Sequence, residues 1–237
     1  MSAFPVPPGL VSRPLPRLLV SVRDLAEAEA AQLAGADLID AKDPERGALG
    51  ALDMELVAEI VARVAGAAVT SAVADPTPGS VAAMARTGVD WVKTGLDARH
   101  RRDKATMAAL TAAAPSRLIA VLFAEDGPAA QCVPALARAG FAGAMIDTSG
   151  KTGARLPDLA EPEALGAFTA ACRAHGLMSG LAGSLRVTDI PVLSAHRPDY
   201  FGFRGGLCRD FDRHNGIDPL RVAEAVRALR SNHRDAA

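Results

Sequence analysis

Lysine is the residue type in this chain that says most about its chemistry. Of 26 basic residues among 237, only four are lysine, namely Lys42, Lys93, Lys104 and Lys151, and the rest are arginine. Arginine keeps its proton in proteins, whereas lysine can act as a neutral amine when its surroundings lower its pKa. We therefore expect this arginine-rich chain to retain lysine where a titratable amine or an ammonium group is required.

Two aspartates accompany these lysines. Asp40 lies two residues before Lys42, so in a strand both side chains point to the same side. Burial, with Lys93 as a second ammonium nearby, would lower the pKa of Lys42 and let its amine react with a carbonyl. Asp40 and Asp147 could then move protons. The alternative is a purely structural buried ion-pair network, which is disfavoured because such networks rarely stabilise a protein.

Glycine-rich segments provide a second chemical signal. The segments 181–184 and 204–206 read LAGS and RGG. Glycine lets backbone N–H groups approach an anion closely, and an arginine adds charge-assisted hydrogen bonds. We therefore expect a substrate phosphate site, although the same glycines could serve turn geometry alone. Its residues would be Gly183, Ser184, Arg204, Gly205 and Gly206.

The elements that must position these residues follow a repeating pattern. Each repeat has a short β-branched segment, a loop and a longer alanine-rich segment with leucines at helical spacing. Strands are predicted at 17–22, 37–42, 68–73, 90–96, 117–123, 142–148, 178–183 and 200–206. Helices are predicted at 24–34, 53–65, 79–87, 103–113, 129–139, 161–175, 188–195 and 218–230. Eight such units predict an α/β fold, a single (β/α)₈ TIM barrel. A doubly wound open sheet is the second choice, because its GxGxxG motif is missing after the first strand.

The barrel would bring the candidate residues together. Active sites of this fold lie at the carboxyl ends of the strands, and alternate strands fill one layer of the interior. Lys42, Lys93 and Asp147 belong to predicted strands two, four and six, and Lys151 follows strand six. Phosphate is commonly bound by the loops after strands seven and eight, where the glycines lie. Lys104 falls in a helix and is expected at the surface.

Composition restricts the remaining possibilities. The chain is 49% hydrophobic and 22% charged, its net charge is −1, and it has no block of like charges. These values are typical of a globular protein with neither nucleic acid nor membrane as partner, which leaves a small-molecule substrate. We interpret 1–16, rich in proline, as an extended arm and 17–237 as the catalytic barrel. Without a secretory signal the protein is expected in the cytoplasm. A homo-oligomer is left open as its state of assembly.

Other motifs are weaker. The five histidines show no paired spacing, so no metal is expected, and no motif indicates a cofactor. Three cysteines without a CxxC motif are expected to be reduced thiols. The loop 43–47 is either a lid over Lys42 or an ordinary surface loop, and 75–79 is either an active-site loop or a stiff turn.

With these residues in view, the chain resembles the (5-formylfuran-3-yl)methyl phosphate synthase family from about Leu18 to Leu229. The resemblance is carried by the segments 18–51, 90–96, 144–151, 181–185 and 203–217. The most specific part is DAKDPERGALGA at 40–51, which places an aspartate, a lysine and a proline after strand two.

The resemblance implies a lyase that condenses two molecules of glyceraldehyde 3-phosphate, with loss of phosphate and water. Lys42 would form the Schiff base, Lys93 would accept a proton, and Asp40, Asp147 and Lys151 would support them. The product would serve methanofuran or methylofuran biosynthesis, and thus one-carbon metabolism. Two alternatives stay open, a generic class I aldolase of the deoxyribose-phosphate or transaldolase type and a non-catalytic barrel that binds a sugar phosphate.

Overall fold

Eight parallel strands form a closed barrel in the computed structural model, which describes residues 15–150 and 154–234. Each strand pairs with its neighbours in sequence, and β1 pairs with β8 to close the ring. The strands are β1 (Arg17–Val22), β2 (Leu38–Ala41), β3 (Val69–Val73), β4 (Trp91–Gly95), β5 (Leu118–Phe123), β6 (Gly143–Asp147), β7 (Met178–Leu181) and β8 (Tyr200–Phe203). The predicted TIM barrel is confirmed.

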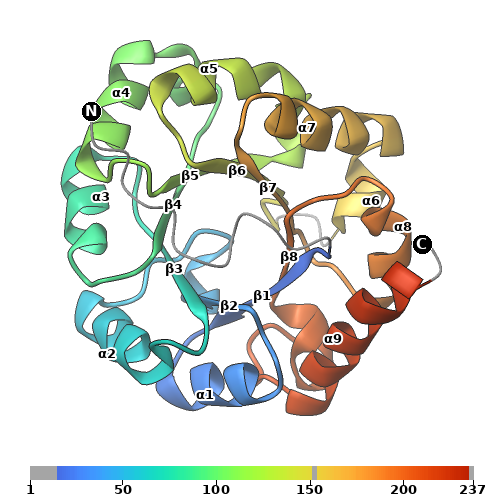
Figure 1. Cartoon of the computed structure of the whole chain (residues 1–237). Coiled ribbons are helices and arrows are strands. Elements are labelled where there is room, and N and C mark those ends of the chain that lie inside the picture. The colour runs from blue at the N-terminus through green and yellow to red at the C-terminus, as the bar shows by residue number, and fades with distance from the viewer. Residues whose placement is uncertain (1–14, 151–153, 235–237) are drawn as a thin grey trace.

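Helices surround this barrel on its outer side, as Figure 1 shows in a view down the barrel axis. They are α1 (Leu25–Leu33), α2 (Met54–Val64), α3 (Pro78–Ala85), α4 (Lys104–Ala113), α5 (Val133–Ala139), α6 (Leu156–Leu159), α7 (Pro162–Ala174), α8 (Ile190–Ser194) and α9 (Pro219–Arg234). Short 3₁₀ turns lie at Pro44–Arg46, His100–Arg102, Ala124–Asp126, Ala129–Cys132, Val187–Asp189, Gly205–Leu207 and Arg209–Phe211.

Capping residues explain where several helices begin. The Asp24 carboxylate accepts a hydrogen bond from the Glu27 N–H at the start of α1. Asp53 and Asp103 cap α2 and α4 in the same way. Such side chains satisfy backbone donors that have no acceptor within the helix. The helix starts predicted at 24, 53 and 103 agree with the structure to within a residue.

Two strands end more than one residue earlier than predicted. β7 ends at Leu181 because Gly183 has φ +111°, which lies outside the range of an extended strand. β8 ends at Phe203, and a 3₁₀ turn starts at Gly205. The glycine-rich segments therefore form loops at the mouth of the barrel. The helix α6 and the 3₁₀ turn that replaces the first part of the predicted 129–139 helix are two further differences.

The interior of the barrel is apolar at the amino-terminal ends of the strands and polar at their carboxyl ends, which form the mouth. Strand residues at every second position point inwards, since side chains alternate along a strand. The inward-facing apolar cluster consists of Leu19, Leu38, Trp91, Ile119, Val121, Met145, Ala182 and Tyr200. Several of these residues begin their strands, so they fill the amino-terminal end. The space that remains opens towards the carboxyl ends of the strands.

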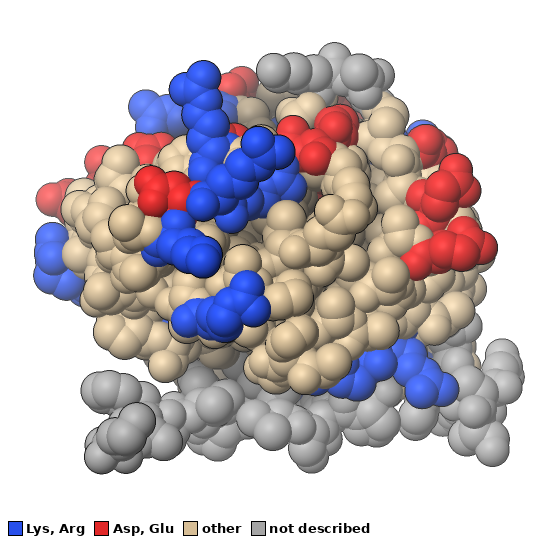
Figure 2. All heavy atoms as spheres, turned by 90° about the horizontal axis from the view of Figure 1, so that it is seen from above, with Lys and Arg blue, Asp and Glu red and all other residues tan. Residues whose placement is uncertain are grey.

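Charge is mixed on the face shown in Figure 2, where basic side chains near the upper edge have acidic neighbours on both sides. Within the described ranges no helix is both long enough and apolar enough to span a membrane. The expected arm falls almost entirely outside the described residues, which begin at Leu15.

Candidate active site

A buried ion pair joins the strands β2 and β4 inside the barrel. The Lys93 Nζ donates to a carboxylate oxygen of Asp40 at 2.7 Å, and both side chains are almost fully buried. The hydroxyls of Ser21 and Ser71 also donate to this carboxylate, at 2.8 and 2.7 Å. Three donors from three strands therefore hold Asp40 in place. Their hydrogen bonds compensate for the hydration that the buried carboxylate has lost.

A second pair lies closer to the mouth. Lys42 follows β2, and its Nζ is 3.6 Å from a carboxylate oxygen of Asp147, the last residue of β6. Both side chains are about 11% exposed, so this pair is reachable from the pocket. The second oxygen of Asp147 accepts a hydrogen bond from the Thr148 N–H at 2.8 Å. Because Asp40 precedes Lys42 by two strand residues, the first pair lies roughly 7 Å deeper.

Burial lowers the pKa of the Lys42 amine from its ordinary value of 10.5. Desolvation is the largest cause, because a charged ammonium loses water contacts that the protein does not replace. The ammonium of Lys93 and the guanidinium of Arg213 lower the pKa further, while Asp147 and Asp40 act in the opposite direction. The neutral, nucleophilic form of Lys42 is therefore more populated than in a free lysine.

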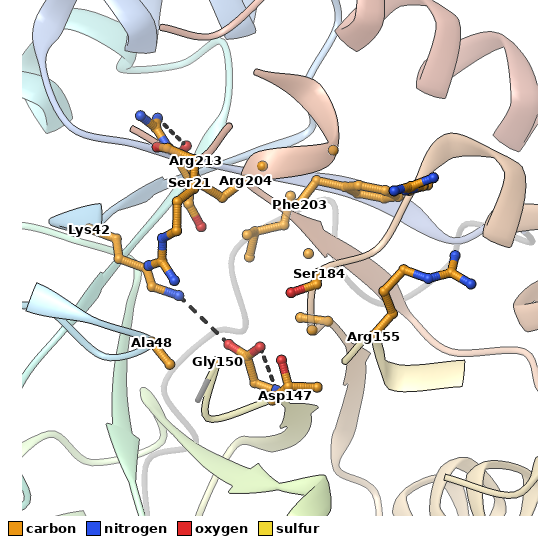
Figure 3. Close-up of a pocket in the computed structure, with 18 of the residues that line it drawn as sticks. Ser21, Lys42, Ala48, Asp147, Gly150, Arg155, Ser184, Phe203, Arg204 and Arg213 are labelled. Atoms are coloured by element: carbon orange, nitrogen blue, oxygen red, sulfur yellow. Dashed lines mark hydrogen bonds and ion pairs between the residues drawn. The ribbon is translucent and has the colours of Figure 1, made fainter. Parts of the chain in front are cut away.

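Both pairs face a pocket of about 640 Å³ at the carboxyl ends of the strands (Figure 3). Lys42, Lys93, Asp147 and the backbone of Gly183 line it. Strand residues of β1, β6 and β8 also line it, and the loops after β2, β6, β7 and β8 complete the wall, including Ala48, Gly150, Ser184, Gly205 and Gly206. A volume of this size suits a small molecule of several to about twenty heavy atoms.

The glycines at the mouth are needed for close packing. A Cβ on Gly183 would lie 2.5 Å from the side chain of Thr148, and one on Gly206 would lie 2.0 Å from the carbonyl oxygen of Leu185. No acceptor for the N–H of Ser184, Gly205 or Gly206 is found among the described residues. These donors line the pocket and suit an anion.

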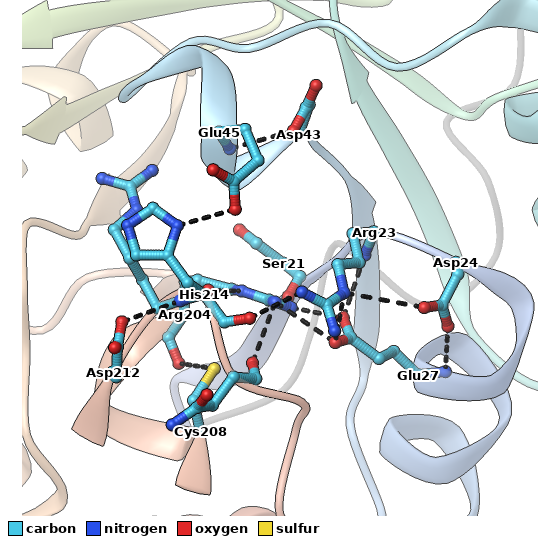
Figure 4. Close-up of polar contacts among 12 residues, drawn as sticks. Ser21, Arg23, Asp24, Glu27, Asp43, Glu45, Arg204, Cys208, Asp212 and His214 are labelled. Atoms are coloured by element: carbon cyan, nitrogen blue, oxygen red, sulfur yellow. Dashed lines mark hydrogen bonds and ion pairs between the residues drawn. The ribbon is translucent and has the colours of Figure 1, made fainter. Parts of the chain in front are cut away.

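Arg204, which the sequence placed among the expected phosphate-binding residues, donates its N–H groups to protein acceptors in this structure. Its guanidinium forms a two-pronged ion pair with Glu27, and both side chains are under 10% exposed (Figure 4). It also donates to the carbonyl oxygens of Ser21, Arg213 and Asn215 at 3.0 to 3.2 Å. All five N–H groups are thus used, and Arg204 fixes the loop after β8 to the first βα unit.

Three further arginines, Arg155, Arg186 and Arg213, line the pocket and were missed by the sequence reasoning. Arg155, near α6, donates to Asp189 at 2.8 Å and lies 3.4 Å from Asp158, and its pKa is raised mainly by Asp189. Arg213 comes from the loop after β8 and donates to the Gly47 carbonyl oxygen at 2.8 Å. Arginine is so frequent in this chain that none of the three was distinctive.

The structure brings together Asp40, Lys42, Lys93 and Asp147, whereas Lys151 lies outside the described residues. Lys104 is exposed at the start of α4, as expected for a surface residue.

The two loops left open by the sequence have different positions. The residues 43–47 form a turn beside the pocket, and Glu45 contacts His214 of the loop after β8 at 2.7 Å. The segment 75–79 contains Thr77, which caps α3, and none of its residues lines the pocket.

Thiols and metal-binding groups do not contribute to the described site. Burial raises the pKa of Cys172 to about 12 and that of Cys208 to about 11, so neither is a ready nucleophile at neutral pH. Within 15–150 and 154–234 no cluster of three histidine, cysteine or carboxylate side chains could hold a metal ion. The ionisable side chains that line the pocket include Lys42, Lys93, Asp147 and His214.

The fold and the site define a (β/α)₈ barrel with ionisable groups at the carboxyl ends of its strands. Phosphoribosyl anthranilate isomerase from Thermus thermophilus superposes with a TM-score of 0.67 at 17% identity, covering 91% of this chain and 98% of its own. The enzyme of that name from Thermotoga maritima has a TM-score of 0.68 at 11% identity, with 92% and 100% covered. These likenesses concern the fold alone.

Sequence comparison identifies the family. The family model described as 4-HFC-P synthase matches residues 18–226. A Methylorubrum extorquens protein, named provisionally as a (5-formylfuran-3-yl)methyl phosphate synthase, is 56% identical over 94% of this chain and 96% of its own. The Methanopyrus kandleri protein of that name is 35% identical over 85% and 93%. The chain belongs to the (5-formylfuran-3-yl)methyl phosphate synthase family, and the expected enzyme class is confirmed.

Proposed function

We propose that this enzyme condenses two molecules of glyceraldehyde 3-phosphate into (5-formylfuran-3-yl)methyl phosphate through an imine on Lys42. The observation that carries this proposal is the amine of Lys42, with its lowered pKa, 3.6 Å from Asp147 in a pocket at the barrel mouth. The physiological role would be the supply of the furan of methanofuran or methylofuran.

The atoms of the reaction balance without an oxidant or a cofactor. Two triose phosphates contain six carbons and two phosphates, and the product retains six carbons and one phosphate. Loss of one phosphate and two water molecules accounts for the difference. The enzyme must therefore break one carbon–phosphate ester bond, form one carbon–carbon bond and close one ring.

The carbon skeleton of the product defines the role of each triose. Only one carbon–carbon bond, between ring positions 3 and 4, divides the product into two pieces of three carbons. One piece carries the formyl group and has lost its phosphate, and the other keeps its phosphate on the exocyclic methylene. The first triose reacts through its aldehyde, and the second must present a ketone at C2, which requires a proton transfer from C2 to C1.

Lys42 is suited to activate the triose that loses its phosphate. Its neutral amine attacks the aldehyde carbon and water leaves, with Asp147 close enough to move the protons of this step. The protonated imine acidifies C2, and loss of that proton lets the electron pair expel phosphate from C3. The enol that results is nucleophilic at C3 and attacks the ketone of the second triose.

The deeper pair offers a route for protons. The amine of Lys93 can accept a proton only in its neutral form, and Asp40 can take up the proton of that ammonium along their 2.7 Å hydrogen bond. We therefore assign the role of proton acceptor to Lys93 and Asp40 together. The N–H groups of Ser184, Gly205 and Gly206 would hold the retained phosphate, with Gly183 allowing the close approach. Arg204 would position this loop instead of touching the phosphate.

The deciding experiment is incubation of the enzyme with glyceraldehyde 3-phosphate, followed by ultraviolet and mass detection of products. We expect a furan aldehyde phosphate and one inorganic phosphate for each furan. A six-carbon product with both phosphates retained would contradict the proposal and indicate a generic aldolase. Tight binding without turnover would indicate a sugar-phosphate-binding barrel.

A further inference from the structure

Arg213 differs from two of the other arginines that line the pocket in what surrounds its charge, whereas the third, Arg186, lies over the ring of Phe211. Arg204 is paired with Glu27, and Arg155 is paired with Asp189. Within the described ranges no carboxylate lies within ion-pair distance of Arg213. Its positive charge therefore has no counter-ion in this part of the protein, although the side chain is half-buried.

A hydrogen bond holds the guanidinium of Arg213 in place, but not all of its N–H donors have an acceptor among the described residues. One Nη donates to the Gly47 carbonyl oxygen at 2.8 Å, which ties the loop after β8 to the loop after β2. The Nε is buried and has no acceptor among the described residues. On the other side lies Gly150, where a Cβ would come 3.7 Å from an Nη of Arg213. The φ of +76° favours glycine at this position, and 3.7 Å is an ordinary van der Waals distance from the guanidinium.

Arg213 and Lys42 enter the pocket from the same side, with Arg155 on the opposite side (Figure 3). The guanidinium is close enough to lower the pKa of the Lys42 amine. Two cations that share a partly buried pocket repel each other, and each has lost part of its hydration. An anion bound between the two cations offsets their repulsion and replaces part of the lost hydration. This arrangement therefore favours an anionic ligand.

We propose that Arg213 forms a second phosphate subsite, beside Lys42, which binds the phosphate that leaves the imine-bound triose. This inference rests on the proposed function, and it assigns the leaving phosphate to a residue distinct from the glycine-rich loops. When the C3–oxygen bond breaks, its electron pair goes to the phosphate oxygen. A guanidinium fork stabilises that developing charge with charge-assisted hydrogen bonds, which strengthens the departure of phosphate.

The test uses inorganic phosphate as the probe and needs no turnover. Calorimetry at constant ionic strength compares the wild-type enzyme with Arg213→Gln and Arg213→Lys. We expect the glutamine variant to bind phosphate at least tenfold more weakly at the affected subsite. The lysine variant should bind with intermediate affinity, because it keeps the charge but loses the fork. Equal affinity in all three proteins would overturn the proposal.

Two control variants separate direct contact from loop placement. Glu45→Ala removes the contact with His214 and so loosens the same two loops while leaving Arg213 unchanged. Arg227→Gln removes an exposed arginine of α9. Both controls should bind phosphate as tightly as the wild type does. An equal loss in Glu45→Ala would mean that loop order, and not the guanidinium, determines binding.

A comparison of two aldehydes distinguishes this inference from the proposed function. Imine trapping by borohydride is measured with glyceraldehyde 3-phosphate and with glyceraldehyde, which has no phosphate. At a pH above the trapping midpoint of both proteins, Arg213→Gln should raise the half-saturating concentration of the phosphorylated aldehyde at least tenfold and leave that of glyceraldehyde unchanged. Equal shifts for both aldehydes would reject the subsite. Absence of any adduct in the wild type would reject the imine proposal and leave the phosphate titration interpretable.

Discussion

Asp40 and Lys42 share one side of one strand, yet their ionic partners lie on different strands. Asp40 accepts a 2.7 Å hydrogen bond from Lys93 of β4, whereas Lys42 faces Asp147 of β6 at 3.6 Å. The two amines of the site are consequently unequal. Lys93 is held tightly in the interior, whereas Lys42 is loosely paired and more exposed to the pocket. This is the position expected of an amine that attacks a substrate.

Replacing Lys42 by arginine should abolish furan formation and leave the fold intact. Arginine keeps the charge beside Asp147 but cannot form an imine. Borohydride reduction of the wild-type enzyme with substrate should add one adduct, and peptide mapping should locate it at Lys42. Lys104→Arg, at the exposed start of α4, is the matched control and should retain wild-type activity. An adduct found only on Lys93 would reverse the assignment.

Loss of Lys93 or Asp147 should slow the chemical steps more than binding. Lys93→Ala and Asp147→Asn are each expected to reduce kcat by about 10²-fold or more, the usual effect of removing a positioned acid or base. Steady-state kinetics with glyceraldehyde 3-phosphate provide the measurement. If only KM rises and kcat is maintained, both residues bind substrate and do not move protons.

Asp40→Asn should destabilise the fold because it leaves the buried ammonium of Lys93 without its counter-ion. Removing one partner of a buried pair costs about 3–5 kcal/mol. Urea denaturation followed by circular dichroism measures the change in the free energy of unfolding. The matched control is Glu29→Gln, which breaks an exposed pair with Arg63 and should cost less than about 1 kcal/mol. Similar losses in both variants would mean that the Asp40–Lys93 pair is not energetically special.

The pH dependence of imine formation should follow the charges around Lys42. The lowered pKa means that the trapping rate rises with pH through a midpoint below that of a free lysine. Asp147 raises this pKa and Arg213 lowers it, so Asp147→Asn should move the midpoint to lower pH and Arg213→Gln to higher pH. The measurement is the midpoint of the trapping rate with glyceraldehyde, independent of its amplitude. Shifts of the same sign would contradict this electrostatic picture.

The same pKa has a consequence for stability. Because the folded state holds Lys42 with a lowered pKa, the unfolded state binds more protons between the two pKa values. The free energy of unfolding should therefore gain a contribution as pH rises through the folded pKa, and this contribution should disappear in Lys42→Met.

Isotope labelling tests the division of the carbon skeleton. Triose labelled with carbon-13 at C1 should give a product labelled at the formyl carbon and at ring position 2. Triose labelled at C3 should give label at the phosphorylated methylene and at ring position 4. Carbon-13 nuclear magnetic resonance of the purified product distinguishes these positions. Any other pattern would mean that a different carbon–carbon bond joins the two trioses.

Much of the fold and part of the site could be predicted from the sequence. The eight strands follow from their repeating pattern, and the scarcity of lysine pointed to Lys42 and Lys93. Which carboxylate pairs with which amine could not be predicted, because it depends on the closure and register of the barrel. Alternation along a strand defines the side on which a group lies but not its partner across the interior.

Long-range partners of arginine were also beyond the sequence. Arg204 is bound by Glu27, 177 residues earlier in the chain, and no local pattern indicates that contact. Arg213 differs from Arg155 and Arg204 in the acceptors around its guanidinium, and the folded chain determines those acceptors. In a chain so rich in arginine, residue type alone could not separate the cations that hold loops from those that face the pocket.

The pairing of Glu27 with Arg204 has a consequence for the newly made protein. The amino-terminal partner leaves the ribosome long before the carboxyl-terminal one, and the ring of strands closes only when β8 reaches β1. A reactive amine in an incomplete chain would meet metabolites without the groups that direct its chemistry. Because Lys42 reaches the surroundings that lower its pKa only when the barrel closes, its amine is expected to keep the ordinary, less reactive pKa in the unfinished chain.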